Sequence, residues 1–185
     1  VDQSSLTFTS GDWEAPQTVT VTGEDDAGLD GNVGYTIELS PATSTDPGYS
    51  GFDPTDVGVV NLDNDAVSIS VTPTTDLQTT EVGGTATFDV VLGSQPGADV
   101  VIDLTSSDPT EGTVSPASLT FTPGDWVTPK VVTITGQPDD FVDGDIGYVV
   151  QTAAAVSVDQ NYDGLDPNDV DVTIIDDDVA DLTAG

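Results

Sequence analysis

Carboxylate side chains are the residues of this sequence that could do chemistry. Asp and Glu together number 34 against a single Lys or Arg, which gives a formal net charge of -33. Almost all of this acid is Asp, a short side chain that suits turns and is a common Ca²⁺ ligand. The sequence contains no Cys and no His, so thiolate and imidazole ligands are excluded. These residues predict the binding of hard cations through oxygen.

The same composition excludes several classes of function. A chain with one cationic side chain cannot neutralise phosphates, so we expect it to bind neither nucleic acid nor an anionic membrane surface. The carboxylates occur in clusters, and none is set apart in an apolar segment as a general acid. We therefore predict that the protein is not an enzyme, and a hydrolase that uses an Asp pair is the least favoured alternative.

A repeat with a period of 113 residues organises the chain. The segment SLTFTSGDWEAPQTVTVTG at 5–23 returns as SLTFTPGDWVTPKVVTITG at 118–136. When residues 5–65 are aligned with 118–178 without a gap, 30 of 61 positions are identical. A match of this length predicts two copies of one structural unit.

The period of the repeat sets the expected domain boundaries. Residues 66–178 form one complete unit, residues 1–65 match only the second half of a unit, and residues 179–185 are the start of another unit or a linker. Half a sandwich cannot bury its own core. We therefore expect either that the chain was cut from a longer array or that another segment completes the first half.

Within the complete unit, apolar and polar residues alternate with a period of two, as in half-buried β-strands. Val132 and Ile134 alternate with Thr133 and Thr135, for example, and turn residues separate such runs. Seven short strands in roughly 110 residues indicate an all-β, immunoglobulin-like antiparallel β-sandwich, repeated in tandem. The strands are expected at about 67–73, 84–92, 98–106, 113–122, 129–136, 145–155 and 169–175.

Three large aromatic residues are candidates for ligand stacking or for the core. Because large aromatics dominate core burial, we expect Trp126, Tyr148 and Tyr162 to cover the core. A carbohydrate-binding module, which needs exposed stacking rings, is therefore disfavoured.

Acidic loops are expected to converge at one end of the sandwich. If successive strands alternate in direction, the loops after the first, third and fifth strands share one pole with the exit of the seventh. Together they carry Glu81, Asp108, Glu111, Asp139, Asp140, Asp143, Asp145, Asp176, Asp177 and Asp178. Bare carboxylates about 4 Å apart repel by roughly 1 to 4 kcal/mol per pair. They are relieved by protonation or by a divalent cation, and Ca²⁺, with roughly 6–8 oxygen ligands in flexible geometry, suits them better than Mg²⁺.

The half unit carries acidic residues of its own, some of them close to the join with the complete unit. The linker at this join is almost absent, and calcium bound there would stiffen it. The candidate ligands are Asp25, Asp26, Asp30, Asp63 and Asp65.

Taken in order, these motifs resemble those of the Calx-beta family. The matching pieces are Glu81-Val82-Gly83, the stretch LTFTPGDW…P…VTITG at 119–136, the pair Asp139-Asp140, and the terminal 175–178. The resemblance covers one full unit and half of another. It implies a seven-stranded sandwich that binds calcium at one pole, with ligand positions that would match Glu81, Asp108, Asp139, Asp140, Asp176, Asp177 and Asp178.

Two departures from the family pattern bear on the number of ions. The loop after the fifth strand reads Asp143-Gly144-Asp145, where the family often has a Glu-rich stretch before an aromatic residue. In the half unit, Ala27 replaces the second Asp of the acidic pair, so its site should be poorer.

The family also suggests a setting, because tandem Calx-beta units occur in very large bacterial surface proteins and adhesins. We therefore expect an extracellular repeat of such a protein, which acts as a calcium-rigidified spacer or an adhesive module. The alternative is a subunit of an extracellular filament or surface layer, in which a strand from a neighbouring copy completes the half unit. The expected partners are calcium ions and neighbouring repeats of the same chain or of other copies.

Overall fold

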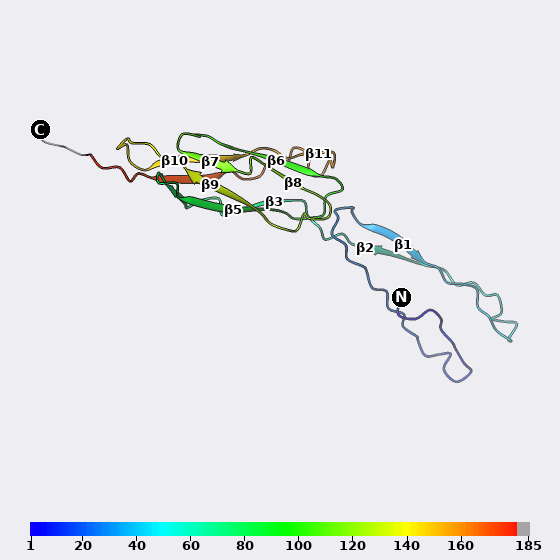
Figure 1. The fold of residues 1–185 in the computed structure, drawn as a ribbon. Helices are drawn as coiled ribbons and strands as arrows, with labels where there is room; N and C mark the ends of the chain where they lie inside the picture. Colours follow the sequence, from blue (N-terminus) through cyan, green and yellow to red (C-terminus); the bar gives the residue numbers. More distant parts are fainter. Residues whose placement is uncertain (181–185) are drawn as a thin grey trace, which may run out of the picture. The chain divides into compact units, whose positions relative to one another are not determined.

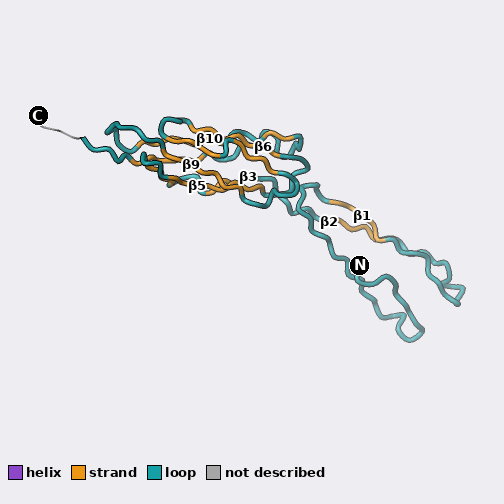
Figure 2. Tube along the Cα trace, in the orientation of Figure 1, coloured by secondary structure: helices purple, strands orange, loops and turns teal. Residues whose placement is uncertain are grey.

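The computed structural model describes residues 1–180, and all of their regular structure is β (Figures 1 and 2). The chain divides into two compact units. The smaller unit comprises residues 1–26 and 30–64, and the larger comprises residues 27–29 and the chain from Asp65 onward. In the described part of the chain, no helix has the length and apolar character that crossing a membrane requires.

The larger unit is an immunoglobulin-like β-sandwich of two sheets. Its strands are β3 (Ile69–Thr72), β4 (Leu77–Thr80), β5 (Thr85–Leu92), β6 (Val100–Ser106), β7 (Gly112–Ser115), β8 (Ser118–Phe121), β9 (Lys130–Gly136), β10 (Ile146–Thr152), β11 (Val156–Ser157) and β12 (Val170–Ile175). One sheet has the order β3-β5-β9-β7. The other runs β11-β6-β10-β12-β4, with β8 also paired to β6. All pairs are antiparallel except β12 with β4, which is parallel.

The prediction of seven strands is wrong in detail, because one predicted strand is divided between the sheets and two further strands, β4 and β11, lie outside the predicted ranges. The first, expected at 67–73, is β3, and the chain then crosses to form β4 in the other sheet. The fourth, expected at 113–122, divides into β7 and β8. Pro73 and Pro116 lie at the two breaks, and proline cannot donate a ladder hydrogen bond, so each favours a change of sheet.

The core lies between the sheets and follows the period-two pattern. The buried apolar side chains are Val71, Leu77, Phe88, Val90, Leu92, Val100, Ile102, Leu104, Leu119, Phe121, Val132, Ile134, Tyr148, Val150, Ala155, Tyr162, Val170, Val172 and Ile174. Trp126 is partly buried and packs against them. The prediction that Trp126, Tyr148 and Tyr162 serve the core is therefore confirmed.

A buried tyrosine ties the two halves of this sandwich together. The hydroxyl of Tyr162 donates to the carbonyl of Ser94 at 2.7 Å and accepts from the Ser94 N–H at 3.1 Å. Both residues are fully buried. Because each buried polar group has its partner, the hydroxyl joins the turn after β5 to the loop that precedes β12 without a desolvation penalty.

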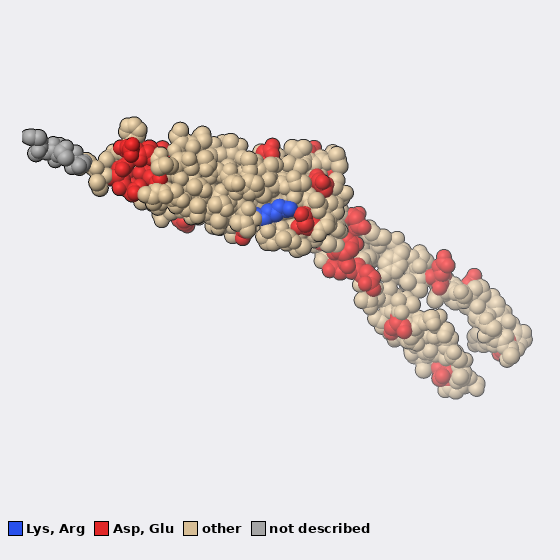
Figure 3. Space-filling view, viewed as in Figure 1, with Lys and Arg blue, Asp and Glu red and all other residues tan. Residues whose placement is uncertain are grey.

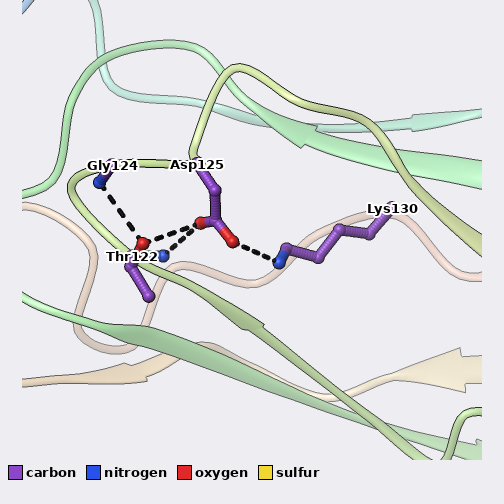
Figure 4. Close-up of polar contacts among 4 residues, drawn as sticks. All are labelled: Thr122, Gly124, Asp125 and Lys130. Carbon is purple, nitrogen blue, oxygen red and sulfur yellow. Dashed lines mark hydrogen bonds and ion pairs between the residues drawn. The ribbon is translucent and has the colours of Figure 1, made fainter.

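The one basic side chain of the protein serves the fold. Lys130 lies 5.0 Å from the centre of the Phe121 ring, and its Nζ is 2.7 Å from Asp125 Oδ2 (Figure 4). The other oxygen of Asp125 accepts hydrogen bonds from the N–H and the hydroxyl of Thr122. The hydrogen bond from Lys130 and those from Thr122 lower the pKa of Asp125 to about 2. The TPGDW motif is thus a closed turn.

The smaller unit holds one pair of antiparallel strands, β1 (Val33–Ile37) and β2 (Val57–Asn61). Their register, with Tyr35 opposite Val59, repeats that of β10 and β12, where Tyr148 is opposite Val172. None of residues 1–65 is buried. The half repeat therefore keeps this strand pair of the complete repeat but not its core, and residues 5–8 and 17–23, the counterparts of β8 and β9, form no strand.

Candidate metal centre

Three carboxylates meet at one pole of the larger unit. Glu81 follows β4, and Asp176 and Asp178 follow β12. One oxygen from each lies within 4.8 Å of those of the other two. The parallel pairing, which puts Thr80 opposite Ile175, makes both strands end at the same level and so brings the three together.

Strand alternation explains why these three side chains turn inward. On β4 the buried positions are Leu77 and Thr79, and Glu81 continues that face with only 3% of its surface exposed. On β12 the buried positions are the even-numbered ones, and Asp176 and Asp178 continue them. The core face of each strand thus becomes acidic as it leaves the sandwich.

Backbone hydrogen bonds hold two of these carboxylates. Gly144, with φ of 82°, donates its N–H to Asp176 Oδ2 at 2.7 Å, and the Asp178 N–H donates to Asp176 Oδ1 at 2.8 Å. A longer bond of 3.4 Å runs from the Asp177 N–H to Glu81 Oε2. The positive φ at Gly144 favours glycine, so the loop that delivers this N–H depends on that residue.

Asp178 is held differently, because its Oδ2 is buried and accepts no hydrogen bond from any described residue. Burial raises the pKa of this carboxyl, and the charges of Asp140, Asp176, Asp177 and Asp139 raise it further. A buried carboxylate oxygen without a donor is costly unless a proton or a cation satisfies it. This oxygen therefore points to a positive ligand.

Burial and neighbouring carboxylates also raise the pKa of Glu81. Burial raises its pKa most, the hydrogen bond from Asp177 opposes that shift, and the charges of Asp176, Asp139 and Asp178 add to it. No cationic side chain neutralises these charges, since Lys130 is the only Lys or Arg in the sequence and it pairs with Asp125.

A second acidic group lies at the same pole around Glu111, which is 8% exposed. Burial raises the pKa of Glu111, followed by the charges of Asp108, Asp139 and Asp143. Asp108 itself accepts from the Thr110 hydroxyl and N–H, which lower its pKa. Asp139 is thus close enough to act on both groups.

The predicted convergence of acidic loops at one pole is confirmed. Figure 3 shows Asp and Glu gathered at one end of the larger unit. Through the contacts above, and through the bond of 3.2 Å from the Asp176 N–H to Asp145 Oδ1, the structure brings together all ten residues expected there. Within this set, Asp177 is exposed and its carboxylate lies outside the group of three. Period-two alternation along β12 is the sequence signal that separates Asp177 from its neighbours. The role of these residues as metal ligands stays a prediction.

The acidic residues of the half unit are arranged differently. Asp25, Asp26 and Asp30 are exposed. Asp63 Oδ2 accepts from the Gly31 N–H at 2.6 Å, which repeats the bond from Gly144 to Asp176. Among the described residues of 1–65, no three carboxylates come as close as those at Glu81, and Glu81 lies outside the repeat match that relates the two units. Asp65 belongs to the larger unit and is partly exposed.

Without a bound cation, the larger unit is expected to become more stable as the pH falls from neutrality toward the raised pKa values of its buried carboxyl groups. Glu81, Glu111 and Asp178 have raised pKa values in the folded state, so the folded protein binds more protons than the unfolded chain in this range. The penalty for their charge is complete above these pKa values and is relieved as they protonate. Asp125, with its pKa lowered to about 2, opposes the trend only at lower pH.

Thermal unfolding in chelator across this interval measures the effect. The variant Glu81→Gln, which removes one of the three charges, should flatten the pH dependence. A midpoint that falls steadily as the pH is lowered over the same range would contradict the expectation.

No protein-family model matches the sequence, and no curated protein matches it. Solved structures with a similar fold include the apo form of the Calx CBD1 domain, at 18% identity over 60% of this chain and 98% of that one, with a TM-score of 0.47. The calcium binding domain CBD12 of CALX1.1 is 19% identical over 60% of this chain and 45% of that one, with a TM-score of 0.47. The periplasmic chaperone SfaE is 9% identical over 62% and 61%, with a TM-score of 0.45.

Proposed function

We propose that this chain is a calcium-binding β-sandwich module. The observation that carries the proposal is the group of Glu81, Asp176 and Asp178, whose oxygens lie within 4.8 Å of one another around a buried, unpartnered Asp178 Oδ2. Three clustered carboxylates that no cationic side chain neutralises form a donor set for a hard divalent cation. Binding is favoured over catalysis, because these carboxylates gather around one point instead of presenting a separate acid and base.

Calcium fits this donor set better than magnesium. Magnesium demands near-ideal octahedral geometry and keeps several of its waters, whereas calcium accepts carboxylates and carbonyls in irregular arrangements. The site is built from the residues that follow β4 and β12 and from the loop between β9 and β10. Ligands from these three segments favour an irregular arrangement around the ion.

The surrounding acid supports more than one ion at this pole. Glu81, Asp176 and Asp178 would hold one ion, with Asp140 and Asp139 of the loop after β9 contributing charge. A second ion would lie at Glu111, on which the charges of Asp108, Asp139 and Asp143 act. Asp139 would then belong to both groups.

Replacing Asp178 by Asn is the test of this site. Asp178→Asn should weaken calcium binding by at least about tenfold, since even outer partners of metal ligands are worth about 10- to 100-fold in affinity. Asp177→Asn is the matched control, because this neighbouring carboxylate is exposed and outside the group of three. Asp89→Asn, on the exposed face of β5, is a second control.

Isothermal titration of the full chain with Ca²⁺ measures all three variants. The proposal requires that the loss of calcium affinity is largest in Asp178→Asn and smaller in Asp177→Asn. The affinity of Asp89→Asn should equal that of the parent. Equal losses in all three variants would mean that calcium only screens a general negative charge and that no site exists.

For the whole protein we propose an extracellular role, as a spacer or adhesive repeat in a larger surface protein. The support is the tandem repeat together with the net charge of -33. Self-repulsion of that size opposes a compact chain, and bound divalent cations reduce it. Calcium should therefore narrow the distribution of interatomic distances measured by small-angle scattering. Identical distributions in calcium and in chelator would remove the stiffening role while leaving calcium binding intact.

A further inference from the structure

Two glycines face each other where the sheet β3-β5-β9-β7 reaches the acidic pole. Gly112 of β7 is the register partner of Gly136 of β9, and both residues are buried. A methyl group on Gly136 would overlap the carbonyl oxygen of Thr80, and one on Gly112 would overlap the Tyr148 hydroxyl. Thr80 and Tyr148 belong to the other sheet, so the two sheets close on each other here at residues without a side chain.

The close approach at Gly136 holds the turn that carries Glu81. The Thr80 carbonyl accepts hydrogen bonds from the N–H groups of Gly83 and Gly84, each at 3.1 Å, which close a turn around Glu81. The Gly136 N–H donates to the Gly84 carbonyl at 3.0 Å. The end of β9 therefore holds this turn at two points, by packing against Thr80 and by a hydrogen bond to Gly84.

The next residue of the chain holds the turn that carries Glu111. The Gln137 N–H donates to the Glu111 carbonyl at 2.9 Å. Within that turn, the N–H groups of Glu111 and Gly112 donate to the Asp108 carbonyl at 3.3 Å and 3.0 Å. Two successive N–H groups, those of Gly136 and Gln137, thus bind the backbones of both acidic turns.

Asp139 follows in the same segment and connects the two acidic groups by charge. It is among the residues whose charge acts on Glu81 and among those whose charge acts on Glu111. The segment 136–139 therefore contacts both groups, first through its backbone and then through a carboxylate.

The obstacle to a larger residue at Gly136 cannot move aside alone. A side chain that meets a new methyl group can change its rotamer, whereas the Thr80 oxygen is part of the backbone of the turn. A larger residue must therefore displace either the end of β9 or the turn in which Glu81 is the next residue. Binding groups have to be held within about 0.5 Å of their productive positions, so such a displacement is large for the site.

We propose that Gly136 is a positioning residue for cation binding, which sets the spacing between the turn of Glu81 and the turn of Glu111. The inference rests on the proposed function and adds to it a residue that offers no ligand side chain. Gly136 is not among the glycines with positive φ, so the contact with Thr80, and not the conformation of its own backbone, requires glycine at this position.

Gly136→Ala is the test, with Gly147→Ala as the matched control. A methyl group on Gly147, an exposed glycine of β10, meets no atom within 4 Å. Isothermal titration of the full chain with Ca²⁺ should show a loss of at least about tenfold in affinity for Gly136→Ala, as for outer partners of metal ligands. Gly147→Ala should bind with the affinity of the parent. Circular dichroism and thermal unfolding in chelator establish that both variants are folded at the temperature of the titration.

Amide hydrogen exchange of the parent chain tests the same inference without a substitution. Calcium should slow the exchange of the Gly136 and Gln137 N–H groups, because their hydrogen bonds join the two acidic turns to β9. The control is the Gly97 N–H, which lies beyond the far end of β5 and donates to Asp159 Oδ2 at 2.7 Å. Its exchange rate should not respond to calcium.

Two results would overturn the inference and leave the proposed function intact. The first is a folded Gly136→Ala variant that melts at a lower temperature in chelator but binds Ca²⁺ as tightly as the parent, since Gly136 would then serve the fold alone. The second is exchange at Gly136 and Gln137 that calcium does not change, and this measurement decides by itself where Gly136→Ala does not fold. A parent chain that binds no Ca²⁺ would instead defeat the proposed function, and this inference with it.

Discussion

Removing calcium is expected to lower the melting temperature of the larger unit by about 10 °C. A ligand that binds only the folded state adds about 2.7 kcal/mol at a hundredfold excess over its Kd, and in a domain of this size each kcal/mol shifts the midpoint by about 4 °C. The structural reason is the pole around Glu81 and Asp178, where burial and like charges oppose ionisation. Differential scanning calorimetry in calcium and in excess chelator measures the shift.

The control for this experiment is the Asp178→Asn variant. Its melting temperature should respond less to calcium than that of the parent, because one ligand is gone. Magnesium at the same concentration should restore less of the lost stability. Superimposable melting curves in calcium and in chelator would defeat the proposed function.

The second large effect is expected in the core. Phe121→Ala should destabilise the larger unit by about 3–5 kcal/mol, since Phe121 is fully buried and its removal leaves a cavity. The loss also takes the ring away from Lys130, which lies over it at 5.0 Å. Chemical denaturation followed by tryptophan fluorescence measures the difference.

The repeat supplies a control at the equivalent position. Phe8→Ala removes the same side chain from the same motif in the smaller unit, where Phe8 is 53% exposed. It should change the unfolding free energy of the free chain by less than about 0.5 kcal/mol, the usual limit for surface sites. A comparable loss at both positions would mean that Phe8 is covered in solution by a part of the free chain.

The sequence pattern predicted the class of fold and the acidic pole because both depend on local signals. Alternation along 129–136 and 169–175 marked strands that the structure confirms as β9 and β12. Alternating strand direction was then enough to gather Glu81 with Asp176 and Asp178, without knowledge of any contact.

The changes of sheet were not predicted, because both sheets face one core. A strand that leaves one sheet for the other keeps its apolar side chains inward, so its alternation shows no break. Leu77 and Thr79 continue the odd-numbered buried positions of Val71, yet they belong to β4, a strand that lies outside the predicted ranges. Pro73 was the available signal, since proline interrupts a ladder of hydrogen bonds.

The roles of neighbouring acidic residues could be distinguished only once the path of the backbone was known. Asp176, Asp177 and Asp178 are chemically identical, and charge alone cannot rank them. Once β12 ends at Ile175, its alternation places the first and third on the core side and the second toward solvent.

The change of sheet has a mechanical consequence. The chain enters the larger unit through β3 and β4 and leaves it through β12, and β4 and β12 are parallel neighbours. A force that pulls the two ends of the unit apart therefore slides these strands lengthwise past their partners. Their hydrogen bonds are loaded together and must break together, whereas a peeled hairpin gives way one bond at a time. The entering segment is also held in both sheets, so tension has to shear two separate ladders before the core is opened.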